Sequence, residues 1–115
     1  MTIERFHSNH RMSQLVAHGG LLYTSGLIPD MEGGSIEEQT RQILNKLDCL
    51  LKEAGSEKSK IISATIWLVD MNDFSAMNEI WDRWVDPENP PARACVQSGL
   101  ALPQWKIEIQ FLIAQ

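Results

Sequence analysis

Residues 105–114, WKIEIQFLIA, alternate in polarity with the two-residue period of a β-strand. One face would carry Ile107, Ile109, Phe111 and Ile113, and the other face Lys106, Glu108, Gln110 and Leu112. The two faces differ sharply in polarity, which is typical of a strand that packs one face on a hydrophobic core. The pattern therefore predicts a strand with Glu108 near its middle, on the more polar face.

Four further stretches read as strands. Residues 14–26, QLVAHGGLLYTSG, are broken by Gly19 and Gly20, which accept the positive φ angles of a tight hairpin turn, and residues 2–6, TIERF, can add a strand before them. Residues 60–71, KIISATIWLVDM, are apolar on both parities, which predicts a central strand covered on both faces. Residues 92–97, ARACVQ, predict another strand directly after Pro90 and Pro91, which set its start.

Two stretches predict helices. Residues 35–38, SIEE, have the form of a capping box, in which Ser35 and Glu38 each bind an exposed backbone N–H. Apolar residues then recur at helical spacing until Gly55, which stands where a left-handed cap belongs. Residues 72–85 predict a second helix that ends before Pro87, with an apolar face made of Phe74, Met77, Trp81 and Trp84.

The element order β-β-β-α-β-α-β-β predicts an α+β architecture with two helices against one mixed sheet. Two helices, each ~10 Å wide, cover about 20 Å, whereas five or six strands at ~4.8 Å span about 24–29 Å, so the helices cover one face only. The other face would carry Leu, Trp, Val, Thr and Cys side chains together with charges, and large apolar patches are uncommon on monomers. We therefore expect a second copy of the chain to bury that face in a homo-oligomer.

Length and composition limit the classes of protein. The 115 residues fit one domain, 1–115, with 43% hydrophobic and 22% charged residues, and they contain no apolar stretch long enough for a membrane span. The start of the chain lacks the pattern of a secretory signal and only two cysteines occur, which favours a cytoplasmic location. A net charge of −5 with scattered cations argues against nucleic acid as a partner.

Arg93 is the residue that the strand pattern leaves unexplained, because a buried guanidinium needs an anion. It shares a parity with Cys95 and Gln97 on the strand at 92–97. One interpretation is a structural salt bridge between Arg93 and Glu108. The other is that Arg93 binds the carboxylate of a substrate with both ends of its fork, while Glu108 handles a water molecule.

Other candidate residues have a structural and a functional interpretation. His7 and His10 could lie near one another but lack a third ligand, so surface histidines are favoured over a metal site. Ser25 and Gly26 are typical of a turn, with a pocket wall as the alternative. Cys95 suits packing better than nucleophilic catalysis, and the four tryptophans indicate core or interface area.

Taken together, several stretches resemble the Rid proteins, also called YjgF-like proteins or imine deaminases. They are LLYTSGLIP at 21–29, the helix at 37–55, ATIWLVDMNDFSAMNEIW at 64–81, PARACV at 91–96 and KIEI at 106–109. The resemblance covers nearly the whole chain. It implies the fold of bacterial chorismate mutase and a homotrimer with a pocket at each subunit interface.

The resemblance also implies an activity, the hydrolytic deamination of 2-imino acids such as 2-iminopropionate or 2-iminobutanoate, without metal or organic cofactor. In that case Arg93 binds the substrate carboxylate and Glu108 orients or deprotonates the attacking water. The remaining pocket positions of the family match Ser25, Gly26, Asn78 and Cys95. Partners would be the 2-imino or 2-keto acid and further copies of the chain, with neither nucleic acid nor membrane.

Three features depart from the family pattern. Met12, in RMS, stands where many members carry an aromatic residue at the pocket mouth, the segment 29–35 is short, and Gln110 replaces a second Glu. The resemblance therefore leaves substrate preference open. A non-catalytic trimer that binds or senses small carboxylates is the alternative function, and the ribonuclease activity of some members is a third.

Overall fold

The computed structural model describes residues 2–31 and 33–115. Met1 and Glu32 lie outside this part, so the prediction for the segment 29–35 is covered only partly. Six strands and two α-helices follow the predicted order. The strands are β1 (Glu4–Ser8), β2 (Ser13–His18), β3 (Leu21–Thr24), β4 (Ile61–Leu68), β5 (Ala92–Gln97) and β6 (Ile107–Ala114); the helices are α1 (Ile36–Ala54) and α2 (Phe74–Trp84).

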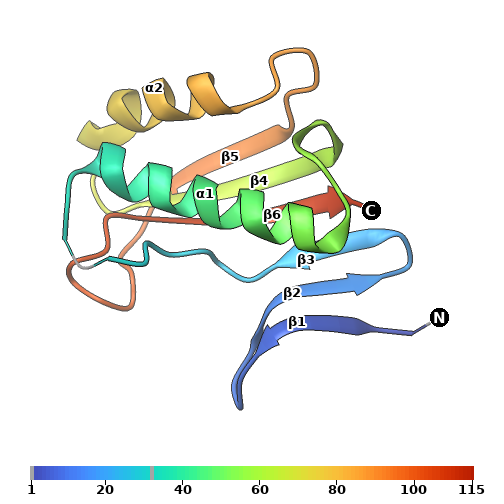
Figure 1. The fold of residues 1–115 in the computed structure, drawn as a ribbon. Helices are drawn as coiled ribbons and strands as arrows, with labels where there is room; N and C mark the ends of the chain where they lie inside the picture. Colours follow the sequence, from blue (N-terminus) through green and yellow to red (C-terminus); the bar gives the residue numbers. More distant parts are fainter. Residues whose placement is uncertain (1, 32) are drawn as a thin grey trace.

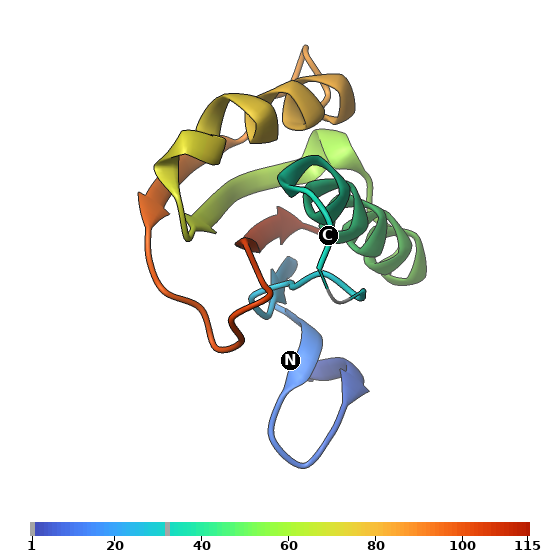
Figure 2. The same cartoon turned by 90° about the vertical axis from the view of Figure 1, so that its left-hand side faces the viewer.

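The strands form one mixed sheet in the order β1-β2-β3-β6-β4-β5, in which only β4 and β5 are parallel. Both helices pack on the same side of this sheet, as Figures 1 and 2 show from two directions. The α+β architecture with one helix-covered face is therefore confirmed. Among the described residues, neither helix has the length and apolar character that crossing a bilayer requires.

The hydrophobic core lies between the sheet and the helices. Ile107, Ile109, Phe111 and Ile113 of β6 all point into it, as their alternation predicted. Strand β6 lies between β3 and β4, so it occupies the middle of the sheet. The helices contribute a stripe of buried residues that includes Ile43 and Leu47 of α1 and Met77 of α2.

The predicted central position of β4 is wrong. It is second from the edge, because β5 pairs beyond it in parallel, and only its helix-facing residues, such as Ile66, are buried. Ser63, Thr65 and Trp67 lie on the opposite face, which is open in this chain. Apolar residues at both odd and even positions of a strand indicate that both faces of the sheet can be buried. They do not indicate what buries the second face.

The start of α1 shows half of the predicted capping box. The Glu38 N–H donates to the Ser35 hydroxyl over 3.1 Å, and Gly55 ends the helix in the left-handed region at a φ of 71°. The Glu38 carboxylate lies against Gly34 instead, and the described hydrogen bonds include none from the Ser35 N–H to that carboxylate. Helix α2 follows a short 3₁₀ turn, in which the Asp70 carboxylate accepts from the Asn72 N–H.

Candidate active site

Glu108 lies on the open face of the sheet, in a hollow of about 460 Å³. The register puts Glu108 opposite Trp67, and the next pair, Ile109 and Ile66, points into the core. The wall of the hollow includes Arg11, Met12, Ser25, Gly26, Trp105 and Glu108. Four residues predicted for the site, Met12, Ser25, Gly26 and Glu108, are therefore brought together.

Backbone pairing between residues 25–27 and β6 sets the position of Gly26. Leu27 and Ile109 exchange both of their backbone hydrogen bonds, at 2.7 and 3.1 Å. The Glu108 side chain consequently lies directly over Gly26, where a Cβ atom would be only 2.8 Å from the Glu108 carboxyl carbon. Gly26 is required here because the carboxylate occupies the space of a side chain.

Two buried polar residues hold the backbone around the hollow. The Thr24 hydroxyl accepts from the Phe111 N–H and donates to the Ser25 carbonyl, which fixes the end of β3 beside β6. Gln39, which is fully buried in α1, donates to the Gln104 carbonyl and accepts from the Lys106 N–H. Helix α1 thereby fixes the chain on either side of Trp105.

Burial raises the pKa of the Glu108 carboxyl above the usual value for glutamate, because the half-buried charge loses part of its hydration. A carboxylate with a raised pKa is a better proton acceptor than an exposed one. Arg11 and Lys46 line the same hollow, and Lys46 is already paired with Asp30 and bound to the Ile28 carbonyl. Within one chain, Arg11 is thus the guanidinium that shares the hollow with Glu108.

Arg93 lies on the other side of the sheet. In β5 it pairs with Ala64 and Cys95 pairs with Ile66, and both of these partners point toward the helices. The guanidinium carbon of Arg93 is 5.3 Å from the ring centre of Trp81 and 5.9 Å from that of Phe74, both in α2. The distances are those of cation–π contacts.

Two predictions about Arg93 are therefore wrong. An Arg93–Glu108 salt bridge within one chain does not form, because the sheet separates the two side chains. Arg93 and Cys95 also do not lie on the open face, where the width argument had placed a cysteine and the resemblance had implied that Arg93 binds its carboxylate. Parity within a strand says which residues share a face, but only the register with β4 decides which face it is.

Asn78 lies near Arg93 rather than near Glu108. It occupies the helical stripe of Phe74 and Trp81, the two residues under the Arg93 guanidinium. Its side-chain oxygen is buried without a hydrogen-bond partner among the described residues. Arg93 and Cys95 of β5 thus face the helix that carries Asn78. In the described part of the chain, the Asn78 oxygen has no donor and the Arg93 guanidinium has no ion-pair partner.

His7 and Cys95 each make contacts that a structural role would explain. His7 binds the Glu53 carboxylate at 2.8 Å on the surface, and no three potential metal-ligating side chains gather in the described part of the chain. Cys95 packs against the core, and burial raises the pKa of its thiol despite the opposing charge of Arg93. A protonated thiol is consistent with a packing role.

Sequence reasoning missed Arg11, Lys46 and Trp105 as walls of the hollow. Arg11 is the first residue of the RMS motif and Trp105 directly precedes the KIEI motif, which is the one signal that could have pointed to them. Lys46 lies on α1, and nothing in the sequence distinguishes it from an ordinary exposed lysine of a helix.

The fold and the hollow define a class: a small α+β protein with a mixed sheet, two helices on one face and a glutamate set in the other face. The chain belongs to the family described as Endoribonuclease L-PSP, whose model matches residues 2–115. The chain is 43% identical to a RutC family protein of Haemophilus influenzae, and the alignment covers 95% of each of the two chains.

Two solved structures extend this comparison. A YjgF family member from Neisseria meningitidis superposes with a TM-score of 0.97 at 40% identity, covering 100% of this chain and 96% of that one. The YyfA protein of the Rid family from Yersinia pestis superposes with a TM-score of 0.88 at 32% identity, covering 94% and 90%. The resemblance to the Rid or YjgF-like family, and with it the chorismate mutase-like fold, is thus confirmed.

Proposed function

We propose that the protein hydrolyses small 2-imino acids to 2-keto acids and ammonia. The observation that carries this proposal is the half-buried carboxylate of Glu108, which lies against Gly26 in a hollow large enough for a small substrate and a water molecule. Membership of the Rid family supports it.

The reaction needs little more than a positioned base. Glu108 accepts a proton from water as the water oxygen bonds to the electrophilic imine carbon. Because the imine reacts in its protonated form, its C=N electrons move to nitrogen and a neutral carbinolamine results. Glu108 returns the proton to the carbinolamine nitrogen and takes the proton of the hydroxyl group as the C–N bond breaks, which leaves a 2-keto acid and ammonia, and the ammonia then takes up that proton. Free imines already hydrolyse without a catalyst, so the ~10²–10⁴-fold that general-base catalysis typically contributes is sufficient.

Arg93 is the proposed ligand of the substrate carboxylate, since its guanidinium has no ion-pair partner in the described residues. Because the sheet separates Arg93 from Glu108 in one chain, a site that uses both requires a second copy. The open sheet face, where Tyr23 and Val96 are 43% and 47% exposed, offers a surface for such a copy. We propose a homotrimer in which each site takes Arg93 from one chain and Glu108 from another.

Arg11 is the competing ligand for the carboxylate, because it shares the hollow with Glu108 in the same chain. The two arginines make different predictions. If Arg93 binds the carboxylate, Arg93→Ala removes catalysis and Arg11→Gln changes it little. If Arg11 binds it, the effects are reversed and one chain suffices.

The test is a coupled assay in which threonine dehydratase or an amino-acid oxidase generates the imine and the appearance of keto acid is followed. The wild type is expected to accelerate hydrolysis, and Arg93→Ala and Glu108→Gln to reduce kcat/KM by about 100-fold or more. Arg5→Gln, on the exposed strand β1, serves as the charge-matched control. No acceleration over buffer with any imine contradicts the proposal.

Two other functions are distinguished by the same proteins. If the protein is a non-catalytic carboxylate-binding trimer, the Glu108→Gln variant would still bind pyruvate, and the wild type would show no turnover of imines. The family description also names an endoribonuclease. A net charge of −5 disfavours a polyanionic substrate, and we expect no cleavage of RNA.

A further inference from the structure

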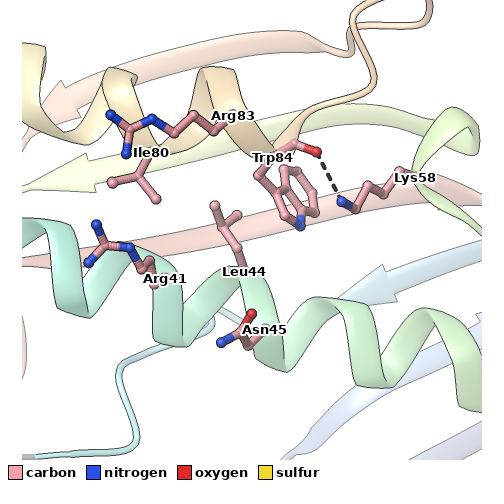
Figure 3. A pocket seen from close by; sticks show the side chains of 7 residues that line it. All are labelled: Arg41, Leu44, Asn45, Lys58, Ile80, Arg83 and Trp84. Carbon is pink, nitrogen blue, oxygen red and sulfur yellow. Dashed lines mark hydrogen bonds between the residues drawn. The ribbon is translucent and has the colours of Figure 1, made fainter.

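A groove between α1 and α2, on the side of the sheet opposite Glu108, has no role in the proposed reaction. It encloses about 220 Å³. Its walls include Arg41 and Leu44 of α1, Lys58, and Ile80, Arg83 and Trp84 of α2. Figure 3 shows the guanidinium groups of Arg41 and Arg83 extending from opposite helices on either side of Ile80.

The polar part of this groove is cationic. Arg41, Lys58, Arg83 and the neutral Asn45 line it, and none of the described carboxylates does, in a chain whose net charge is −5. Glu37 and Glu79 stand one helical turn before the two arginines, yet neither arginine forms an ion pair in the described part of the chain. Two guanidinium groups that line one groove without a counterion repel one another, so an anion between them is favoured.

Lys58 is already fixed in place. Its ammonium group donates to the Trp84 carbonyl over 3.0 Å, seen in Figure 3, and lies 4.9 Å from the centre of the Trp84 ring. Lys58 adds positive charge to the groove, but one of its N–H donors is already used in the hydrogen bond to Trp84. Arg41 and Arg83 are both exposed and therefore supply the free donors.

Apart from Asn45, the rest of the groove is apolar. Leu44 and Ile80 are buried, and the Trp84 indole N–H donates to the Asp48 carboxylate over 3.0 Å, which fixes the ring plane. The volume is below the ~300–1,000 Å³ of ordinary ligand cavities, so an occupant is small. It would present one anionic end and one apolar end.

We propose that this groove binds a small carboxylate with a short, branched apolar chain. The carboxylate lies between the guanidinium groups of Arg41 and Arg83, where planar forks can each donate two hydrogen bonds. The apolar chain contacts Leu44, Ile80 and the Trp84 ring. The site is separate from the proposed active site and does not depend on its activity.

The test is an NMR titration of the ¹⁵N-labelled protein with isovalerate, isoamyl alcohol as the neutral analogue, and inorganic phosphate. Isovalerate is expected to shift the backbone amides at 41–45 and 80–84 and the Trp84 indole signal in a saturable manner. Isoamyl alcohol and phosphate should each bind at least tenfold more weakly. Equal binding of either analogue, or the absence of saturable shifts, overturns the proposal.

Three variants assign the donors. Arg41→Gln and Arg83→Gln should each weaken isovalerate binding at least tenfold, whereas Arg5→Gln, which removes one exposed positive charge outside the groove, should leave it unchanged. Glu108→Gln should also leave it unchanged, which separates this proposal from the proposed hydrolysis. If Arg41→Gln and Arg5→Gln weakened isovalerate binding equally, the effect would come from the net charge of the protein, which would contradict the proposed site.

Discussion

At the scale of single residues, the contact between Glu108 and Gly26 is the basis of the chemistry proposed for the open sheet face. A carboxylate is held over bare backbone by the pairing of Leu27 with Ile109, and its desolvation follows from that position. The proposed chemistry therefore depends on Gly26, which has no side chain, as much as on Glu108 itself.

Gly26→Ala should displace the Glu108 carboxylate, because the added Cβ would enter its space. We expect kcat/KM for 2-iminobutanoate to fall by about 100-fold, the typical effect of an ångström-scale misplacement. Gly99→Ala is the control, since a Cβ there meets nothing within 4 Å. Equal activity in both variants would show that the position of Glu108 is not limiting.

The raised pKa of Glu108 predicts the pH profile of the proposed reaction. Only the ionised carboxylate accepts a proton, so kcat/KM should fall as the pH is lowered through that raised pKa. The midpoint of this acidic limb should lie above ~4.3, the value of an unperturbed glutamate. A midpoint at or below that value would mean that cations such as Arg11, Lys46 or a partner's guanidinium outweigh burial.

At the scale of elements, local patterns predicted almost every helix and strand. The alternation in β6, the Gly19-Gly20 turn and the Ser35 cap are consequences of neighbouring residues, and all appear in the structure. The place of β4 in the sheet was wrong, and the face on which Arg93 lies was wrong. Both depend on the register between strands distant in sequence, which local patterns do not contain.

The Ser35 cap should contribute measurably to stability, because its hydroxyl binds the otherwise free Glu38 N–H. Ser35→Ala should lower the free energy of unfolding by about 1 kcal/mol, measured by urea denaturation. Ser75→Ala, at an exposed serine of α2, should change it by less than ~0.5 kcal/mol. A Ser35→Ala effect no larger than that of Ser75→Ala would mean that solvent satisfies the Glu38 N–H equally well.

At the scale of the whole molecule, the sheet divides the predicted site residues into two groups. The hollow on one face is lined by Met12, Ser25, Gly26 and Glu108. On the other face, Arg93 and Cys95 point toward α2, the helix that contains Asn78. The resemblance pointed to Met12, Ser25, Gly26 and Glu108 in the hollow, whereas Arg11, Lys46 and Trp105 were missed. The division of the site residues between the two faces was not predictable from the sequence, because it follows from the assembled sheet, and it means that a site with Arg93 and Glu108 needs two copies.

Mixing two inactive variants tests this shared site most directly. Arg93→Ala and Glu108→Gln chains are unfolded together, refolded as mixed oligomers and assayed for 2-iminobutanoate hydrolysis. Each variant alone should be inactive, whereas a 1:1 mixture should recover about one quarter of wild-type activity, the fraction of head-to-tail interfaces that pair an intact Arg93 with an intact Glu108. No recovery in oligomers shown to contain both chains, while the wild type is active, would contradict a site made of Arg93 and Glu108 from two chains.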